Sequence, residues 1–159
     1  AGNAQAALDA IEDAHRAELP RDFFTPERPD WSSGFASVEG HLVPKQEVFR
    51  KLIRSFRAFL LSRIGRAEDG LFDLRELTRG EQRSRFDPYN GLYCFLYSKL
   101  LQELGGSRPD HPVTMLGQSV KIMQERLSRI DSPQDRSCVF ESNFWYEQLI
   151  RYARRQNMA

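Results

Sequence analysis

Four basic residues at helical spacing are the strongest candidates for binding chemistry in this 159-residue chain. Within residues 43–66, seven basic side chains stand against one acid, a balance of +6. Residues three and four apart share one face of a helix, so the spacing predicts a row of cations. This basic stripe consists of Arg50, Lys51, Arg54 and Arg57. Such a row can bind phosphate groups or an acidic protein surface.

The basic stripe also has a simpler interpretation, as a solvated face that partly neutralises an acidic N-terminal helix. Residues 1–31 carry seven acids against three arginines, a balance of −4. The two regions therefore face different partners, or each other. Aromatic side chains beside the cations would favour RNA, because bases stack on them. Phe49, Phe56 and Phe59 instead fall on the opposite face of the predicted helix. The solvated face remains the simplest interpretation, followed by an acidic protein partner and then by RNA.

A second candidate surface is the aromatic arm, residues 21–42. This segment combines four helix breakers with large rings and shows no helical period, so we predict an ordered irregular segment. Its aromatic residues are Phe23, Phe24, Trp31 and Phe35. They pack either on the body of the chain or on a neighbouring subunit.

Other kinds of chemistry find little support. "EDAH" places Glu12 and His15 three apart, as in half of a di-iron site, but no second pair exists. Cys94 and Cys138 form no CxxC, and no phosphate-binding motif is present. We therefore predict no enzyme activity, cofactor, metal or small-molecule ligand. An enzyme or ligand-binding bundle with a pocket under Tyr93 and Tyr97 stays an alternative.

The hydrophobic periodicity predicts an all-α chain, because no segment alternates as a half-buried strand does. We expect one domain, 1–159, of five to six helices in stacked hairpins or an irregular bundle. It comprises an acidic helix plus the aromatic arm over 1–42 and a helical core over 43–159. The expected helices are 3–18, 44–64, 71–78, 88–104, 112–130 and 142–157.

The segment 87–106 is expected to be the central core helix, with Asp87 as its cap, Pro88 in its first turn and Gly105–Gly106 as its stop. Leucine and tyrosine side chains sweep a wide arc of it, with Phe95 outside the arc and Cys94 as a small buried residue. A length near 17 residues, together with Lys99 and Glu103, excludes a membrane span.

Two stretches, "PYNGLYCFLYSKLLQELGG" and "FWYEQLIRYARRQ", resemble the first helix of pentatricopeptide-type hairpins. Tyr89, Asn90 and Leu92 match the opening Tyr-Asn-x-Leu of such hairpins. The resemblance covers residues 88–159 at most, and the intervals from Leu52 to Leu92 and on to Leu149, 40 and 57 residues, are unequal. It implies stacked helical hairpins, a fold used for RNA binding and for subunit surfaces in organellar complexes.

These patterns together predict a non-catalytic helical interaction protein, an accessory or structural subunit of a larger complex whose partners are other protein subunits. An RNA-binding helical-repeat protein is the alternative. The low cysteine content predicts an intracellular protein. The first residue, Ala1, is read as the trace of a trimmed segment, and with the hairpin resemblance it suggests the mitochondrial matrix.

Overall fold

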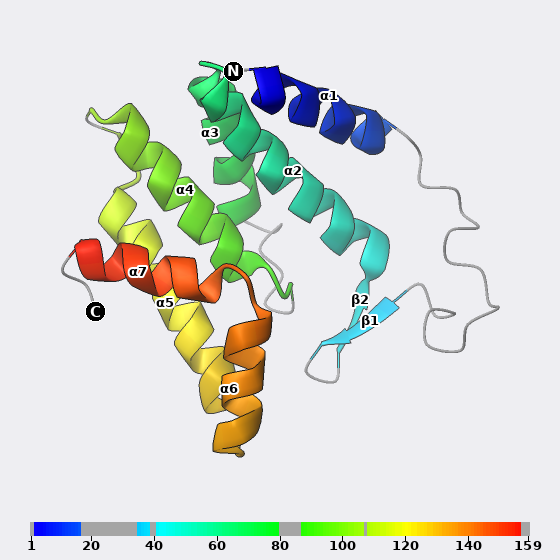
Figure 1. The fold of residues 1–159 in the computed structure, drawn as a ribbon, viewed down its shortest axis with the longest axis vertical. Coiled ribbons are helices and arrows are strands. Elements are labelled where there is room, and N and C mark those ends of the chain that lie inside the picture. The colour runs from blue at the N-terminus through cyan, green and yellow to red at the C-terminus, as the bar shows by residue number, and fades with distance from the viewer. Residues whose placement is uncertain (1, 17–34, 39–40, 80–86, 107, 157–159) are drawn as a thin grey trace. The chain divides into compact units, whose positions relative to one another are not determined.

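The computed structural model describes residues 2–16, 35–38, 41–79, 87–106 and 108–156 (Figure 1). The chain divides into two compact units, Ala1–Tyr89 and Asn90–Ala159, and each is described by itself. The organisation as one domain stays a prediction.

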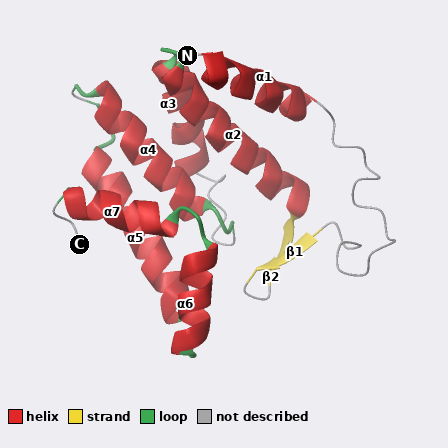
Figure 2. Ribbon diagram, in the orientation of Figure 1, coloured by secondary structure: helices red, strands yellow, loops and turns green. Residues whose placement is uncertain are grey.

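Helices dominate both units, as Figure 2 shows, so the predicted all-α class is confirmed. The described residues form seven helices rather than five or six. They are α1 (Gly2–Arg16), α2 (Lys45–Arg63), α3 (Ala67–Thr78), α4 (Asn90–Leu104), α5 (Pro112–Ser128), α6 (Pro133–Ser142) and α7 (Tyr146–Arg155). The helix that the sequence analysis missed is α6, which shows no apolar periodicity because none of its residues is buried.

A small hairpin replaces part of the segment predicted to be irregular. Strands β1 (Phe35–Val38) and β2 (His41–Pro44) pair antiparallel, with Phe35 opposite Pro44 and Val38 opposite His41. The prediction that Pro44 opens the long helix was therefore wrong by one residue. Strands of four residues are too short to show an alternating pattern, and proline is tolerated at the end of an edge strand.

In the first unit, α2 and α3 pack through a very close backbone contact. A Cβ added at Gly70 would lie 2.3 Å from the carbonyl oxygen of Ala58, so only glycine allows this approach. Buried side chains on both sides of the contact complete this core: Ile53, Ala58, Leu61, Leu74 and Leu77. This packing fixes which face of α3 points toward α2.

In the second unit, α4 is the central helix, as predicted, and α5 and α7 pack around it. Its residues from Asn90 to Ser98 are all buried, and Cys94 is 1% exposed, which confirms the predicted buried cysteine. Phe95 was predicted to lie outside the buried arc, and this was wrong. It is 3% exposed because Tyr152 of α7 packs its ring edge-on at 5.7 Å between centroids.

The boundaries of α4 also differ slightly from the prediction. Asp87 was predicted to cap the helix with Pro88 in its first turn, but α4 begins at Asn90. The carboxylate of Asp87 instead accepts a hydrogen bond from the backbone N–H of Tyr89 at 2.9 Å, in the turn before the helix. The predicted stop is confirmed, since Gly105 and Gly106 both have positive φ, 60° and 78°.

Of the helices that the structure describes, none combines the length and apolar character that crossing a membrane requires.

Candidate protein interface

The basic stripe lies on α2, where its four residues have different surroundings. Arg50 is exposed, while Lys51 pairs with Glu47 one turn earlier on the same helix, at 2.7 Å. Arg54 and Arg57 point toward α3 and are about three-quarters covered, with 27% of each side chain exposed. The structure therefore does not present the stripe as one continuous cationic row.

Asp73 of α3 is the residue that draws the two arginines inward. Arg54 Nε donates to Asp73 Oδ1 at 2.8 Å, and Arg57 Nη1 donates to Asp73 Oδ2 at 2.7 Å. Asp73 is 8% exposed, and a carboxylate so far from water is stable only when it is paired. Both of its oxygens are thus used, and the positive charge of the two guanidinium groups is partly neutralised within the unit.

A second carboxylate reaches the same network from α1. Arg57 Nε lies 3.3 Å from Oε1 of Glu12, and both side chains are about one-quarter exposed. The acidic first helix therefore contacts the basic helix. Of the two predictions made from their opposite charges, this agrees with the one in which the two regions face each other. The sequence offered no sign of Asp73, because its two partners are 16 and 19 residues away along the chain.

The structure describes only a small part of the aromatic arm. Phe23, Phe24 and Trp31 lie outside the described residues. Phe35 is the first residue of β1, and its backbone pairs with Pro44 of β2. The proposed contacts of the arm, with the chain itself or with a neighbour, stay a prediction.

Tyr93 and Tyr97 are both enclosed by the chain. The two rings are 0% and 1% exposed, and the Tyr97 hydroxyl donates to Asp110 Oδ2 at 2.6 Å. Nearby hydroxyls are used in the same way: Ser98 Oγ donates to the carbonyl of Pro112 at 2.8 Å, and Ser119 Oγ to that of Gly91 at 2.7 Å. These bonds join α4 to α5 and to the loop before it, which leaves this segment with a structural task.

The histidine and cysteine side chains were the remaining candidates for chemistry. His111 caps α5, because its Nδ1 accepts a hydrogen bond from the backbone N–H of Val113 at 3.3 Å. Within the described ranges, no three His, Cys, Asp or Glu side chains gather as a metal site would need. The "EDAH" pair extends beyond what is described, since the side chain of His15 is not included.

Large apolar side chains at the surface are the features that sequence reasoning did not single out. Phe72 on α3 is 63% exposed, and Phe144, between α6 and α7, is 60% exposed. Phe72 points outward because it lies about 200° around α3 from Gly70, which faces α2. Exposed phenylalanine is not detectable from periodicity, because its exposure depends on which neighbours fail to cover it.

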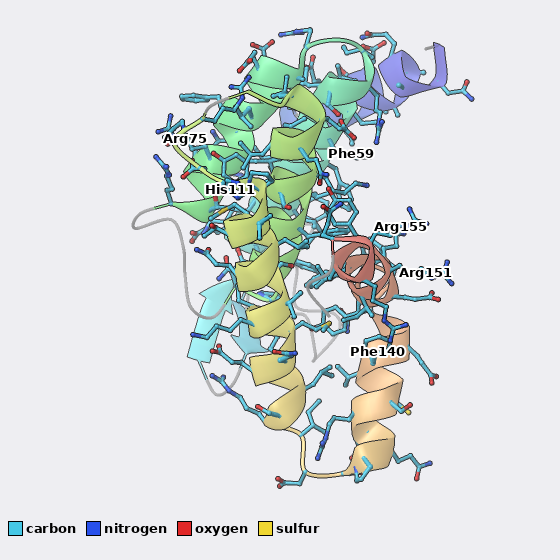
Figure 3. The ribbon with its side chains drawn as sticks, turned by 90° about the vertical axis from the view of Figure 1, so that its left-hand side faces the viewer. Phe59, Arg75, His111, Phe140, Arg151 and Arg155 are labelled. Carbon is cyan, nitrogen blue, oxygen red and sulfur yellow. The ribbon has the colours of Figure 1, made fainter. Side chains whose placement is uncertain are left out.

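The C-terminal helix α7 carries the other group of cations. Figure 3 shows Arg151 and Arg155 pointing away from α5, on the side of α7 opposite its buried residues. Arg151 pairs with Glu147, and Arg154 and Arg155 are exposed in the last turn. Cations at this end also complement the helix dipole, so they have a structural explanation.

Tyr152 of α7 has an altered proton affinity. Burial against α4 raises the pKa of its hydroxyl above 10.0, and the nearby negative charge of Glu103 raises it further. The hydroxyl donates to the side-chain carbonyl of Gln102. This neutral contact helps α7 to pack on α4.

The chain matches the model of a protein family. The model of the family TP_0123_C, described as a C-terminal domain, matches residues 40–157. The chain belongs to the TP_0123_C family. No curated protein and no solved structure matched the chain.

The residues that match the TP_0123_C model include part of the charge network but not all of it. They include α2 to α7, and therefore Arg54, Arg57 and Asp73. Helix α1, which contributes Glu12, lies before the matched residues. The two arginines and Asp73 thus belong to the family domain, whereas their fourth partner comes from an additional helix.

Proposed function

We propose that this protein is a non-catalytic helical interaction protein, an accessory or structural subunit of a larger complex. The observation that carries the proposal is α6, a helix of ten residues in which no side chain is buried. Helices this short are only marginally stable in water by themselves, and in proteins they depend on packing of an apolar face. A partner that covers α6 would supply that packing.

Three apolar side chains in α6 or just after it are the ones that we expect a partner to cover. We define the α6 surface as Val139, Phe140 and Phe144. Val139 and Phe140 are half-buried, and Phe140 packs its ring near Tyr146 at 5.9 Å between centroids. Phe144 is 60% exposed directly after the helix. Phenylalanine is enriched at protein interfaces, where it buries a large area with little loss of side-chain freedom.

The polar residues support the same proposal indirectly. Two of the four residues of the basic stripe, Arg54 and Arg57, form ion pairs with Asp73. The tyrosines under which a pocket was considered, Tyr93 and Tyr97, are enclosed by the chain itself. Both observations favour recognition by surface contacts over phosphate binding at the stripe or chemistry in a pocket.

We also propose that the second unit is built from stacked helical hairpins, a fold detail that would fit this function. The support is that α4 and α5 pack closely along each other, while α7 contacts both α5 and α6. In such stacks each hairpin buries its apolar face against the next, so the last one exposes a surface to a partner. This arrangement is part of the proposal, as is the pentatricopeptide resemblance that suggested it.

The test is gentle isolation of the tagged full-length protein from its own cells, followed by native mass measurement. We expect the wild-type chain to carry a protein partner, and the Phe144→Ser variant to lose it while keeping its helical circular dichroism. Val113→Ser is the matched control, because Val113 is also exposed, at 43%, but lies at the start of α5. Recovery of wild type as a lone 18.5 kDa species would contradict the proposal.

RNA binding is a second candidate, favoured by the exposed Arg154 and Arg155 at the end of α7. Phosphate contacts release counterions, so binding through these residues would weaken steeply as salt rises. An apolar interface at the α6 surface would not. A salt titration of partner binding therefore distinguishes the two candidates.

A further inference from the structure

Helix α1 sits on α2 along a narrow face. Leu8 is 2% exposed and so is fully buried in this contact. The half-buried residues flank it at the spacing of a helix lying in a groove: Ala4, Ala7, Ile11 and Glu12. The opposite face, including Gln5 and Asp9, is exposed. Figure 1 shows α1 lying against α2, and Leu8 is buried in this contact.

The polar part of this contact is set up by α2 and α3 rather than by α1. Asp73 holds one edge of the Arg57 guanidinium through Nη1, at 2.7 Å, and Asp73 is itself held by Arg54 at 2.8 Å. Arg57 Nε is left pointing toward α1, where Glu12 meets it at 3.3 Å. A cation whose position is already fixed loses little freedom when it binds a carboxylate. The face of α2 that α1 covers thus offers a place where Leu8 is buried, which we call the socket, and an oriented cation.

The occupant of this surface lies outside the residues that match the family model, although it belongs to the same compact unit as α2 and α3. Helix α1 lies before the residues that match the TP_0123_C family, whereas α2 and α3 lie within them. Residues 17–44, a connection of 28 residues, join α1 to α2. A tethered helix competes at a high local concentration, so a partner needs better complementarity or a weakened tether contact to replace it.

We propose that this face of α2 is a binding site for an amphipathic partner helix, and that α1 is its internal occupant. The partner helix carries a leucine followed four residues later by a carboxylate, as Leu8 and Glu12 do in α1. The leucine fills the socket and the carboxylate pairs with Arg57. This inference rests on the proposed function, because it names a kind of partner, but it concerns a surface separate from α6.

The experiment uses the full-length chain and a fluorescent peptide with the sequence of residues 2–16. The Glu12→Arg substitution in the chain places a like charge against Arg57 and releases α1 without altering α2. Leu8→Asp releases it through the socket. We expect the peptide, followed by fluorescence anisotropy, to bind both variants at least tenfold more tightly than it binds the wild-type chain, whose site is filled.

Changes in the peptide test the chemistry of recognition while the site stays intact. A Leu8→Ala peptide should bind the Glu12→Arg chain about tenfold more weakly, because the leucine no longer fills the socket. A Glu12→Gln peptide should bind about two- to fivefold more weakly, the effect of one partly exposed ion pair. Asp9→Asn removes the same charge from the exposed face and is the matched control, with unchanged affinity expected.

Several outcomes would overturn the inference. They are failure of the peptide to bind the Glu12→Arg chain, equal binding to the wild-type chain, and equal binding of the Leu8→Ala peptide. A wild-type dimer that exchanges α1 between copies would assign the site to a second copy instead of a partner helix. If Leu8→Asp disturbs the fold, Glu12→Arg decides alone. Peptide results do not depend on Phe144, so this inference and the proposed function can fail separately.

Discussion

The two compact units hold their helices together by different means. In the first, α1, α2 and α3 meet around an ion network of Glu12, Arg54, Arg57 and Asp73 and around the Gly70 contact. In the second, α4 is enclosed by leucine and aromatic side chains, and its buried hydroxyls form neutral hydrogen bonds. The first unit therefore adds an ion network to its apolar core, whereas the second depends mainly on apolar burial.

This difference predicts how each unit responds to its surroundings. Ion pairs that remain partly exposed are weakened by salt, whereas apolar burial is not weakened in that way. Ion pairs also have strict directions, so they place helices in one register. The first unit is thus better suited to a contact that can be replaced, and the second to a fixed support.

The largest effect is expected in the apolar core of the second unit. Leu96→Ala should lower the free energy of unfolding by about 2–5 kcal/mol, because Leu96 is 7% exposed and its truncation leaves a cavity. Leu104→Ala, on the same helix but half-buried, is the matched control and should cost clearly less. Chemical denaturation measures both. A cost for Leu96→Ala below ~1 kcal/mol would mean that α4 is not the centre of the unit.

The next largest effect is expected in the charge network of the first unit. Asp73→Asn should lower the free energy of unfolding by about 1–3 kcal/mol, because it leaves two partly buried arginines without their shared carboxylate. Asp69→Asn is the control, since Asp69 pairs with Arg66 at the surface. The effect of Asp73→Asn should shrink in high salt, and that of Leu96→Ala should not. Equal salt responses would remove the distinction between the units.

A smaller effect tests the polar features that the second unit does have. His111→Ala should lower the free energy of unfolding by about 0.5–1 kcal/mol, because it removes the acceptor that caps α5. His111→Asn keeps a capping oxygen and should recover most of the loss. If alanine and asparagine behave alike in thermal unfolding, the cap contributes nothing.

The smallest effect concerns Tyr152 at high pH. Its pKa is raised in the folded state, so folding favours the neutral hydroxyl. The contribution of this hydroxyl to the free energy of unfolding is therefore fully present below pH 10.0, and it is lost as the pH rises through the folded pKa. Wild type should therefore lose stability on going from about pH 9 to pH 11 more than Tyr152→Phe does. Parallel pH dependence of the two proteins in denaturant unfolding would show that Tyr152 does not contribute.

Most helices could be predicted from the sequence because apolar residues repeat every three or four positions on one side. The pattern failed for α6, because no residue of this helix is buried. Its start is nevertheless marked: Pro133 is the first residue, and the Ser132 Oγ accepts a hydrogen bond from the backbone N–H of Asp135 at 3.2 Å. A capping signature without an apolar stripe was the available sign. The hairpin was missed because its strands are four residues long.

The candidate surfaces were only partly predictable, for a different reason. Helical spacing correctly places Arg50, Arg54 and Arg57 on one side of α2, but it cannot show what lies opposite. Asp73 and Glu12, from other helices, form ion pairs with two of these arginines. Part of the basic stripe is therefore paired within the unit. Exposed Phe72 and Phe144 depend in the same way on packing between elements.

The contact between Gly70 and Ala58 also acts as a spacer for the charge network. Gly70 and Asp73 lie less than one turn apart on α3, so the distance at which the two helices cross also sets the distance from Asp73 to Arg54 and Arg57. A single methyl group at residue 70 would separate the backbones and stretch both bonds, without touching any charged atom. Gly70 therefore sets, by steric means alone, the distance over which Asp73 reaches Arg54 and Arg57.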